Sequence, residues 1–376
     1  MVHRSAKTVI LGAGAMGSAA AYHLARRGEP LVLVEQFGLG HDRGSSHGAA
    51  RITRHSYADH SYARLMLDAF RAWKELEADA GQALYVRTGG VSICPESADY
   101  VGRVAASLAS IEVPHRRMTG REWNRTSPVF GLADSDNVVF EPDAGLLSAA
   151  RAVTLQVELA RQRGGDSTEV FENAPVRRID LDGDRPTLVF DDWQLTADRL
   201  IVTAGAWTGR LVPTLTVPLR PTRQQVLYFR PPDPERYSIG RFPAFIYKGA
   251  SEMDAFYGMP ECFGMGVKAA RHGGPEFDPD VDDRLIEAGY IADVRFFLSR
   301  TLPALAGAPI DRTEVCLYTM TQDEHFRVGP LPGRPEVLVA SPCSGHGFKF
   351  SCLIGRVLAD LAIGGATEVD IDPWRI

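Results

Sequence analysis

The apolar and polar positions at the start of the chain follow the pattern of a strand–helix–strand unit. Residues 7–11 form an apolar run rich in valine, isoleucine and leucine, which is typical of a buried parallel strand. Apolar residues then recur at helical spacing over residues 14–27, and Gly28 follows as a stop signal. Residues 31–35 are apolar up to the last position and predict a second strand. Because the connection between two parallel strands through a helix is almost always a right-handed crossover, the two strands are expected to lie side by side in a parallel sheet.

The rest of the chain alternates between helical segments and blocks of short strands. Apolar residues recur at helical spacing in four further segments, at residues 62–80, 148–164, 281–302 and a last one that ends near 361. Residues 38–56, rich in glycine, serine, histidine and arginine, predict a loop. Strands and loops are predicted over residues 85–145, 176–201, 200–207, 221–275 and 337–340. Runs of the parallel type fall at the start, near 200 and near 338, with antiparallel blocks between them. The pattern therefore predicts an α/β fold with α+β character, in which two domains are interleaved.

Composition narrows the class of protein without deciding its chemistry. The 376 residues, of which 45% are hydrophobic and 23% charged, are enough for two domains with a sizeable core. A net charge of −6 favours neither nucleic acid nor an anionic membrane as a partner. Five cysteines without a CxxC pair argue against a disulfide framework and a zinc site, so no metal is expected.

Membrane and targeting signals are not evident in the sequence. No apolar run approaches the ~18 residues that a membrane span requires. The segment over residues 1–7 is short and polar and does not resemble a signal peptide. We therefore expect a cytoplasmic protein with no membrane partner.

A glycine motif at the first strand–helix junction predicts a dinucleotide site. Gly12 permits the tight turn, Gly14 lets the backbone approach a pyrophosphate, and Gly17 allows the helix to pack closely on the strand. Free N–H groups at the helix N-terminus favour the anion. Glu35 ends the second strand, where a carboxylate accepts hydrogen bonds from a ribose and disfavours the 2′-phosphate of NADP. The motif by itself does not separate NAD from FAD.

A second glycine-rich turn near the end of the chain favours a flavin. Residues 344–349 read Ser-Gly-His-Gly-Phe-Lys and follow a predicted buried strand. The dinucleotide motif at the start of the chain and this glycine-histidine-lysine turn near its end suggest a cofactor that both ends of the chain bind. This arrangement favours a flavin enzyme over a simple nicotinamide dehydrogenase.

Three separated segments resemble the family of monomeric sarcosine oxidase and N-methyltryptophan oxidase, within the D-amino-acid-oxidase-like flavoproteins. They are residues 47–57, 316–319 and 344–350, and the resemblance extends from residue 7 to about 370. It implies a glutathione-reductase-like FAD-binding Rossmann domain that is interleaved with a substrate domain on a large antiparallel sheet. We expect the FAD domain to comprise 1–85, 145–220 and 321–376, and the substrate domain to comprise 86–144 and 221–320.

The resemblance implies FAD bound covalently, through a thioether between Cys316 and the 8α carbon of the flavin ring. Without the resemblance, Cys316 would be interpreted as a buried core cysteine, as the other four cysteines are. Arg51 and His47 fall on the family loop that crosses the flavin, where a cation stabilises the electron-rich reduced ring. The expected cofactor-binding residues are Gly12, Gly14, Met16, Gly17, Glu35, Ser45, His47, Arg51, Cys316, Gly345, Gly347, Phe348 and Lys349.

The resemblance also places a substrate site. Arg54 and Lys349 match the family residues that hold a substrate carboxylate, to which an arginine fork and a lysine point charge are suited. Lys268 matches the family lysine that activates O2 near flavin N5. With Lys268 and Arg51, the expected catalytic residues are the pocket residues His272, Tyr257 and Tyr318, each of which is also compatible with ordinary core packing.

The implied function is oxidation of a secondary amino acid. A hydride leaves the carbon beside the nitrogen for flavin N5, and O2 is then reduced to H2O2. Residues 57–62 and 340–343 depart from the family pattern, so sarcosine and bulkier N-methyl or cyclic amino acids all stay open as substrates. A dehydrogenase that passes electrons to a carrier and a non-catalytic flavoprotein subunit are the alternatives. The resemblance implies a monomer.

Overall fold

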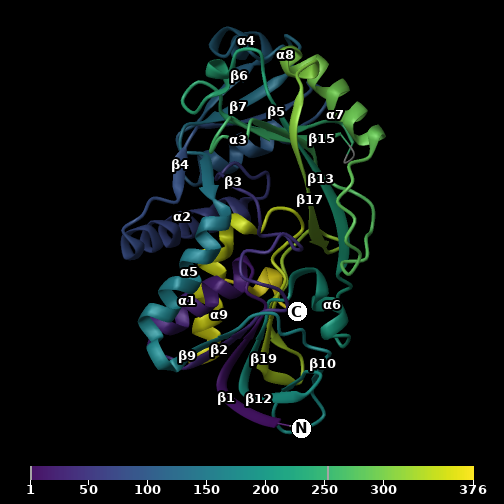
Figure 1. Cartoon of the computed structure of the whole chain (residues 1–376). Helices are drawn as coiled ribbons and strands as arrows, with labels where there is room; N and C mark the ends of the chain where they lie inside the picture. The colour runs from purple at the N-terminus through teal and green to yellow at the C-terminus, as the bar shows by residue number, and fades with distance from the viewer. Residues whose placement is uncertain (1, 252–253) are drawn as a thin grey trace.

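The computed structural model describes residues 2–251 and 254–376, so residues 252 and 253 of the predicted strand block 221–275 lie outside the described part. Figure 1 shows a mixed α/β molecule with a sheet at each end. One sheet, with β1, β12 and β19, lies at the lower end beside a group of helices. The other lies at the upper end, and the long strands β13 and β17 extend from it toward the middle.

The first sheet is built on the strand–helix–strand unit that opens the chain. β1 (Val2–Leu11) lies parallel to β2 (Leu31–Val34) on one side and to β12 (Trp193–Val202) on the other, with Ile10 opposite Ile201. β12 lies parallel in turn to β19 (Arg334–Ala340). The apolar runs at the start, near 200 and near 338 are therefore neighbours. The other strands of this sheet are β9 (Thr168–Phe171), β10 (Arg178–Asp180), β11 (Thr187–Val189) and β18 (Val328–Leu331).

Four helices pack together beside the first sheet (Figure 1). They are α1 (Ala15–Arg26), α2 (His60–Ala80), α5 (Ala149–Gly164) and α9 (Ser351–Gly364). Small residues let α1 and α9 approach closely, because a Cβ atom at Gly355 would lie 2.4 Å from the Cβ of Ala19. Two helices from opposite ends of the sequence thus form one buried pair.

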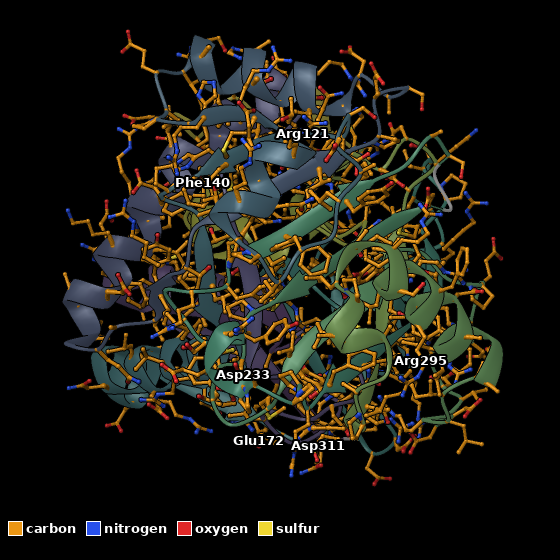
Figure 2. The ribbon with its side chains drawn as sticks, turned by 90° about the horizontal axis from the view of Figure 1, so that it is seen from above. Arg121, Phe140, Glu172, Asp233, Arg295 and Asp311 are labelled. Carbon is orange, nitrogen blue, oxygen red and sulfur yellow. The ribbon has the colours of Figure 1, made fainter. Side chains whose placement is uncertain are left out.

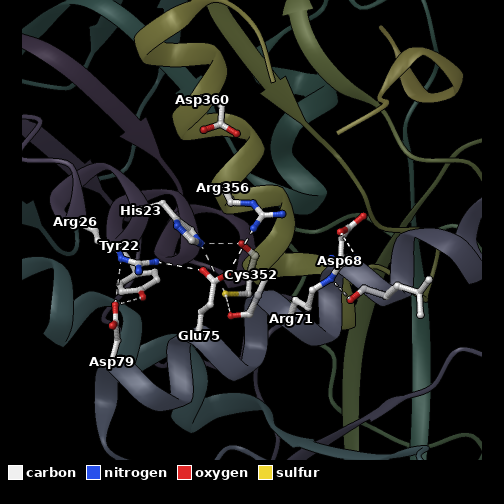
Figure 3. A network of polar contacts seen from close by, with 12 residues as sticks. Tyr22, His23, Arg26, Asp68, Arg71, Glu75, Asp79, Cys352, Arg356 and Asp360 are labelled. Atoms are coloured by element: carbon white, nitrogen blue, oxygen red, sulfur yellow. Dashed lines mark hydrogen bonds and ion pairs between the residues drawn. The ribbon is translucent and has the colours of Figure 1, made fainter. Parts of the chain in front are cut away.

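A polar network joins these helices where they meet (Figure 3). Tyr22 Oη donates a hydrogen bond of 2.6 Å to Asp79, which joins α1 to α2. His23 Nε2 lies 3.0 Å from the carbonyl oxygen of Cys352, and burial lowers the pKa of His23 to about 3, so the neutral ring donates. The network therefore ties the helix after the first glycine turn to the helix after the second.

The second sheet has eight strands in the order β17-β13-β16-β15-β14-β5-β7-β6 and is antiparallel except between β14 and β5. Its strands are β5 (Gly90–Cys94), β6 (Arg116–Thr119), β7 (Asn137–Glu141), β13 (Arg220–Phe229), β14 (Ala244–Lys248), β15 (Ala255–Met259), β16 (Val267–Arg271) and β17 (Ile310–Met320). The accompanying helices are α3 (Tyr100–Ser110), α4 (Gly120–Thr126), α7 (Ala288–Thr301) and α8 (Pro303–Ala306). Seen from above, Arg121 of α4 lies in the upper part of the view and Arg295 of α7 in the lower right part (Figure 2).

The fold differs from the predicted elements in four places. The predicted loop over 38–56 contains β3 (Ala50–Thr53), which pairs with β8 (Gly145–Ser148) and, through it, joins β4 (Tyr85–Arg87). Helices α3 and α4 interrupt the predicted strand block 85–145. The short helix α6 (Thr208–Leu211) follows the turn after β12.

The fourth difference concerns the predicted helix over 281–302, which begins only at Ala288. The preceding segment is rich in aspartates whose side chains bind its own backbone. Asp278 accepts from the Asp280 N–H and Asp283 accepts from the Leu285 N–H, each at 2.9 Å. Such local hydrogen bonds compete with the helical ladder, so the acidic segment stays outside the helix.

The strands divide between the predicted domain ranges. All strands of the first sheet fall within 1–85, 145–220 and 321–376, and the second sheet draws its strands from 90–141 and 220–320. The division into an FAD domain and a substrate domain itself stays a prediction. None of the helices in residues 2–251 and 254–376 is long and apolar enough to cross a membrane.

Candidate active site

A cavity of about 860 Å³ brings together the segments that the sequence singled out. It is lined from both sheets and from the loop over 38–56. Of the predicted site residues, Gly17 alone does not line it. Those that do are Gly12, Gly14, Met16, Glu35, Ser45, His47, Arg51, Arg54, Tyr257, Lys268, His272, Cys316, Tyr318, Gly345, Gly347, Phe348 and Lys349.

The first glycine turn requires glycine at two positions. Gly12 has φ of +100°, and a Cβ atom there would lie 2.6 Å from the carbonyl oxygen of Thr203. A Cβ atom at Gly17 would lie 1.8 Å from the carbonyl oxygen of Gly12. Gly17 therefore acts from behind the cavity, by letting α1 pack on the turn, which is the role that the motif predicted for its third glycine.

The loop over 38–56 lies against this turn through a serine that the sequence analysis did not single out. The Ala15 N–H, the first of α1, donates to Ser46 Oγ at 2.9 Å. Ser45 Oγ donates to the carbonyl oxygen of Leu317, beside Cys316 in β17. The loop is thus anchored to both the glycine turn and the second sheet. A serine in a polar loop carries no sequence signal of its own, so only the fold identifies Ser46.

Glu35 is buried at the end of β2 and faces the cavity. Its Oε2 accepts from the Ala13 N–H at 2.8 Å and its Oε1 accepts from the Phe37 N–H at 3.0 Å. The carboxylate therefore fixes the backbone of the glycine turn. Each of its oxygens still has a lone pair, which a hydroxyl pair such as that of a ribose fits.

Arg51 carries its charge into the cavity with its guanidinium held by the backbone. Nη1 donates to the carbonyl oxygen of Ala50 at 2.9 Å, and Nη2 donates to those of Ser45 and His47 at 2.9 and 2.6 Å. Burial, reinforced by the Arg51 charge, lowers the pKa of His47 to about 4, so His47 is neutral. The loop thus presents one fixed cation beside a neutral imidazole.

Arg54 and Lys349 come from opposite ends of the sequence and meet at Tyr57. The Arg54 guanidinium lies 4.5 Å from the centre of the Tyr57 ring. Lys349 Nζ donates to Tyr57 Oη at 2.9 Å and to the His346 carbonyl oxygen at 2.8 Å. Tyr57, which ends the segment that resembles the family and begins the one that departs from it, is therefore the residue that both basic side chains contact.

Both cations can accommodate an anion. Nε and Nη1 of Arg54 are buried and have no hydrogen-bond partner among residues 2–251 and 254–376. Burial, with the Arg54 charge close by, lowers the pKa of Lys349 well below its usual range. Buried donors without a partner are costly, and a carboxylate is the group that satisfies an arginine fork and restores the charge of the lysine.

Lys268 and Cys316 belong to β16 and β17, the two strands that flank β13 in the second sheet. Lys268 is only 5% exposed, and its Nζ lies 5.8 Å from the ring centres of both Tyr228 and Tyr257. Burial lowers the pKa of Lys268 to about 8. Burial raises the pKa of the Cys316 thiol, while the charges of Arg51 and Lys268 oppose that rise. The cavity thus contains a thiol with two cations in its field.

The second glycine turn closes on two of the predicted pocket residues. Gly345 has φ of +77°, and a Cβ atom there would lie 2.4 Å from the Tyr318 ring and 2.5 Å from the His272 ring. Burial lowers the pKa of His272 to about 4 and raises the pKa values of Tyr318 and Tyr257. These three side chains are therefore uncharged at neutral pH. Cys343, expected in the core, is half-buried and also lines the cavity.

Comparison with known proteins agrees with this arrangement. Residues 7–361 match the family of FAD dependent oxidoreductases. The monomeric sarcosine oxidase of a Bacillus species is 35% identical, over 98% of this chain and 95% of that protein. The N-methyl-L-tryptophan oxidase of Salmonella arizonae is 31% identical, over 98% of this chain and 97% of that protein.

Solved structures show the same fold at lower identity. NikD, described as an unusual amino acid oxidase essential for nikkomycin biosynthesis, superimposes with a TM-score of 0.86 at 20% identity over 99% of this chain and 97% of its own. Glycine oxidase from Geobacillus kaustophilus superimposes with a TM-score of 0.81 at 20% identity, over 99% of this chain and 98% of its own. The predicted fold class is thereby confirmed. By its full-length match and its curated relatives, the chain belongs to the family of FAD-dependent oxidoreductases that includes monomeric sarcosine oxidase and N-methyl-L-tryptophan oxidase.

Proposed function

We propose that this protein is an FAD-dependent oxidase of a secondary amino acid, with an N-methyl or cyclic amine. The observation that carries the proposal is that two basic residues line the cavity that also holds the glycine turn: Arg54, with two buried nitrogens that have no partner in the described residues, and the buried Lys349. The family membership supports the cofactor. Curated relatives named for sarcosine and N-methyl-L-tryptophan, both N-methyl amino acids, support the substrate class.

The residues that line the cavity fit FAD. The turn at Gly12 and Gly14, with the N-terminus of α1, suits the diphosphate, and Glu35 suits the ribose. Arg51 would lie against the flavin ring, and Cys316 would form the thioether to its 8α carbon. When bound, FAD would supply an acceptor for a hydride from the carbon beside the amine nitrogen and a two-electron donor to O2, with H2O2 as the product.

The protein's own part is to orient the substrate and to set its charge. Arg54 and Lys349 hold the carboxylate, and this anion favours the protonated form of Lys349. The amine must be uncharged to lose a hydride. Arg54 and Lys349 hold the carboxylate, and His272, Tyr257 and Tyr318 are neutral, so none of these three side chains carries a charge that would stabilise an ammonium group. Orientation of this kind is worth roughly 7–11 kcal/mol in well-aligned reactions.

A panel of amines tests the proposal on the purified, FAD-loaded protein. Sarcosine, other N-methyl amino acids, proline and pipecolate are offered, and O2 consumption and H2O2 release are recorded. We expect at least one of them to give equal amounts of O2 consumed and H2O2 formed. Flavin reduction without O2 consumption would instead indicate a dehydrogenase, and no reduction by any member would contradict the proposal.

The Arg54→Met variant is expected to bind every carboxylate substrate more weakly. Loss of charge-assisted hydrogen bonds worth about 1.5–3 kcal/mol raises KM roughly 10- to 100-fold. Arg103 also lines the cavity but is exposed, so the matched Arg103→Met variant should retain its KM. Steady-state kinetics on the best substrate checks both. An unchanged KM in Arg54→Met would remove Arg54 from the carboxylate site.

A further inference from the structure

We propose that Glu141, at the end of β7 in the second sheet, is a positioning residue that holds the backbone next to Arg54 so that the arginine side chain is free to bind a substrate carboxylate. This inference rests on the proposed function, since it concerns the affinity of the same site. Glu141 is completely buried and does not line the cavity, so no part of it contacts the substrate.

The Glu141 carboxylate accepts hydrogen bonds from the backbone and the side chains of the two residues after Arg54, His55 and Ser56. Oε1 accepts from the His55 N–H at 2.9 Å and lies 2.7 Å from His55 Nδ1. Oε2 accepts from the Ser56 N–H at 3.0 Å and from Ser56 Oγ. Burial alone would raise the pKa of Glu141, but these donors hold it below the usual value, so the group is a carboxylate. One side chain thus fixes two consecutive peptide units.

The His55 ring continues this support toward the helices. It stacks on Phe70 of α2, with ring centres 4.2 Å apart and an angle of 9° between the planes. Glu141 belongs to the second sheet and Phe70 to a helix that packs beside the first. The segment that carries Arg54 is therefore held between two parts of the fold, at the wall of the cavity.

The charges explain why a carboxylate is suited to this place. Arg51 is held by three carbonyl groups of its own loop, whereas two nitrogens of Arg54 have no hydrogen-bond partner in the described residues. Glu141 directs its lone pairs to N–H and O–H groups of the next two residues. It positions the Arg54 backbone without forming an ion pair that would compete with a substrate for the guanidinium.

Binding of a charged and a neutral ligand to the FAD-loaded protein tests the inference. Propionate and propionamide have the same shape, and their dissociation constants are read from the change in flavin absorbance. The Glu141→Gln variant replaces two acceptor oxygens with one oxygen and a donor. If Arg54 is misplaced, the preference for propionate, which is the ratio of the propionamide to the propionate dissociation constant, should fall roughly 10- to 100-fold. The dissociation constant of propionamide should stay the same. KM for the substrate should rise more than kcat falls.

Asp136 supplies the matched control at the other end of β7. It is buried and accepts from the Ala133 N–H at 3.0 Å, but it lies outside the cavity. Asp136→Asn should lower thermal stability without changing the preference for propionate. An unchanged preference in folded Glu141→Gln would overturn the positioning role while leaving the proposed function intact.

Two further outcomes are decisive. If Glu141→Gln fails to fold or to bind FAD, the milder Ser56→Ala variant, which removes one donor to Glu141, takes its place. Ser56→Ala should lower the preference for propionate over propionamide about threefold. An unchanged preference in this variant overturns the inference. If the wild-type protein shows no preference for propionate over propionamide, the carboxylate site itself fails, and the positioning role fails with it.

Discussion

The Cys316→Ala variant is expected to fold, to bind FAD and to lose its covalent flavin completely. The thiol lies in the middle of β17 and faces the cavity, and alanine removes only one heavy atom from a paired strand. The fold should therefore persist while the only sulfur proposed for the thioether is gone. Acid precipitation checks this result, because covalent flavin stays in the yellow pellet and free flavin stays in the supernatant.

Cys343 provides a matched control for this experiment, since it is a free cysteine that lines the same cavity. Cys343→Ala should give a yellow pellet, which is also the result expected for the wild-type protein. A yellow pellet from Cys316→Ala would refute the assignment of the thioether to Cys316. If Cys343→Ala then gave a colourless pellet, the thioether would belong to Cys343. Flavin in the supernatant of the wild-type protein would exclude any covalent link.

The Lys268→Met variant is expected to react with O2 on the order of 10²–10³-fold more slowly, the cost of removing one preorganised charge from a buried site. Oxygen gains negative charge as it accepts an electron, and the Lys268 ammonium is a buried cation in the cavity. Reduction by substrate without oxygen should change little, because the carboxylate is held elsewhere. Stopped-flow measurement of the two half-reactions separates these effects.

The pH dependence of the O2 reaction gives an independent check on Lys268. Burial lowers its pKa to about 8, so the ammonium form predominates below pH 8 and is lost as the pH rises through that value. The wild-type rate with O2 should fall over this range, and the Lys268→Met rate should be flat. Lys248, which also lines the cavity, is the control, because Lys248→Met should keep the wild-type profile. Equal O2 rates in wild type and Lys268→Met would exclude the proposed role.

The sequence by itself predicted the elements that depend on local pattern. The first strand, the glycine turn and the helix that follows are determined by residues next to one another, because only glycine fits a left-handed turn packed against a helix. The glycine motif and the family resemblance together predicted the cofactor and substrate residues, and the structure gathers all of them but Gly17 around one cavity.

Other features were decided by the tertiary structure, because they depend on contacts between distant segments. The sequence pattern predicted a helix from residue 281, yet the aspartates before α7 bind their own backbone instead. Ser46, Tyr57 and Glu141 resemble ordinary polar residues in the sequence. Each acquires its place only when folding brings its partner to it, the helix N-terminus for Ser46, Lys349 for Tyr57 and the backbone beside Arg54 for Glu141. Hydrogen bonds over such separations leave no periodic pattern in a single sequence, so only the folded chain reveals them.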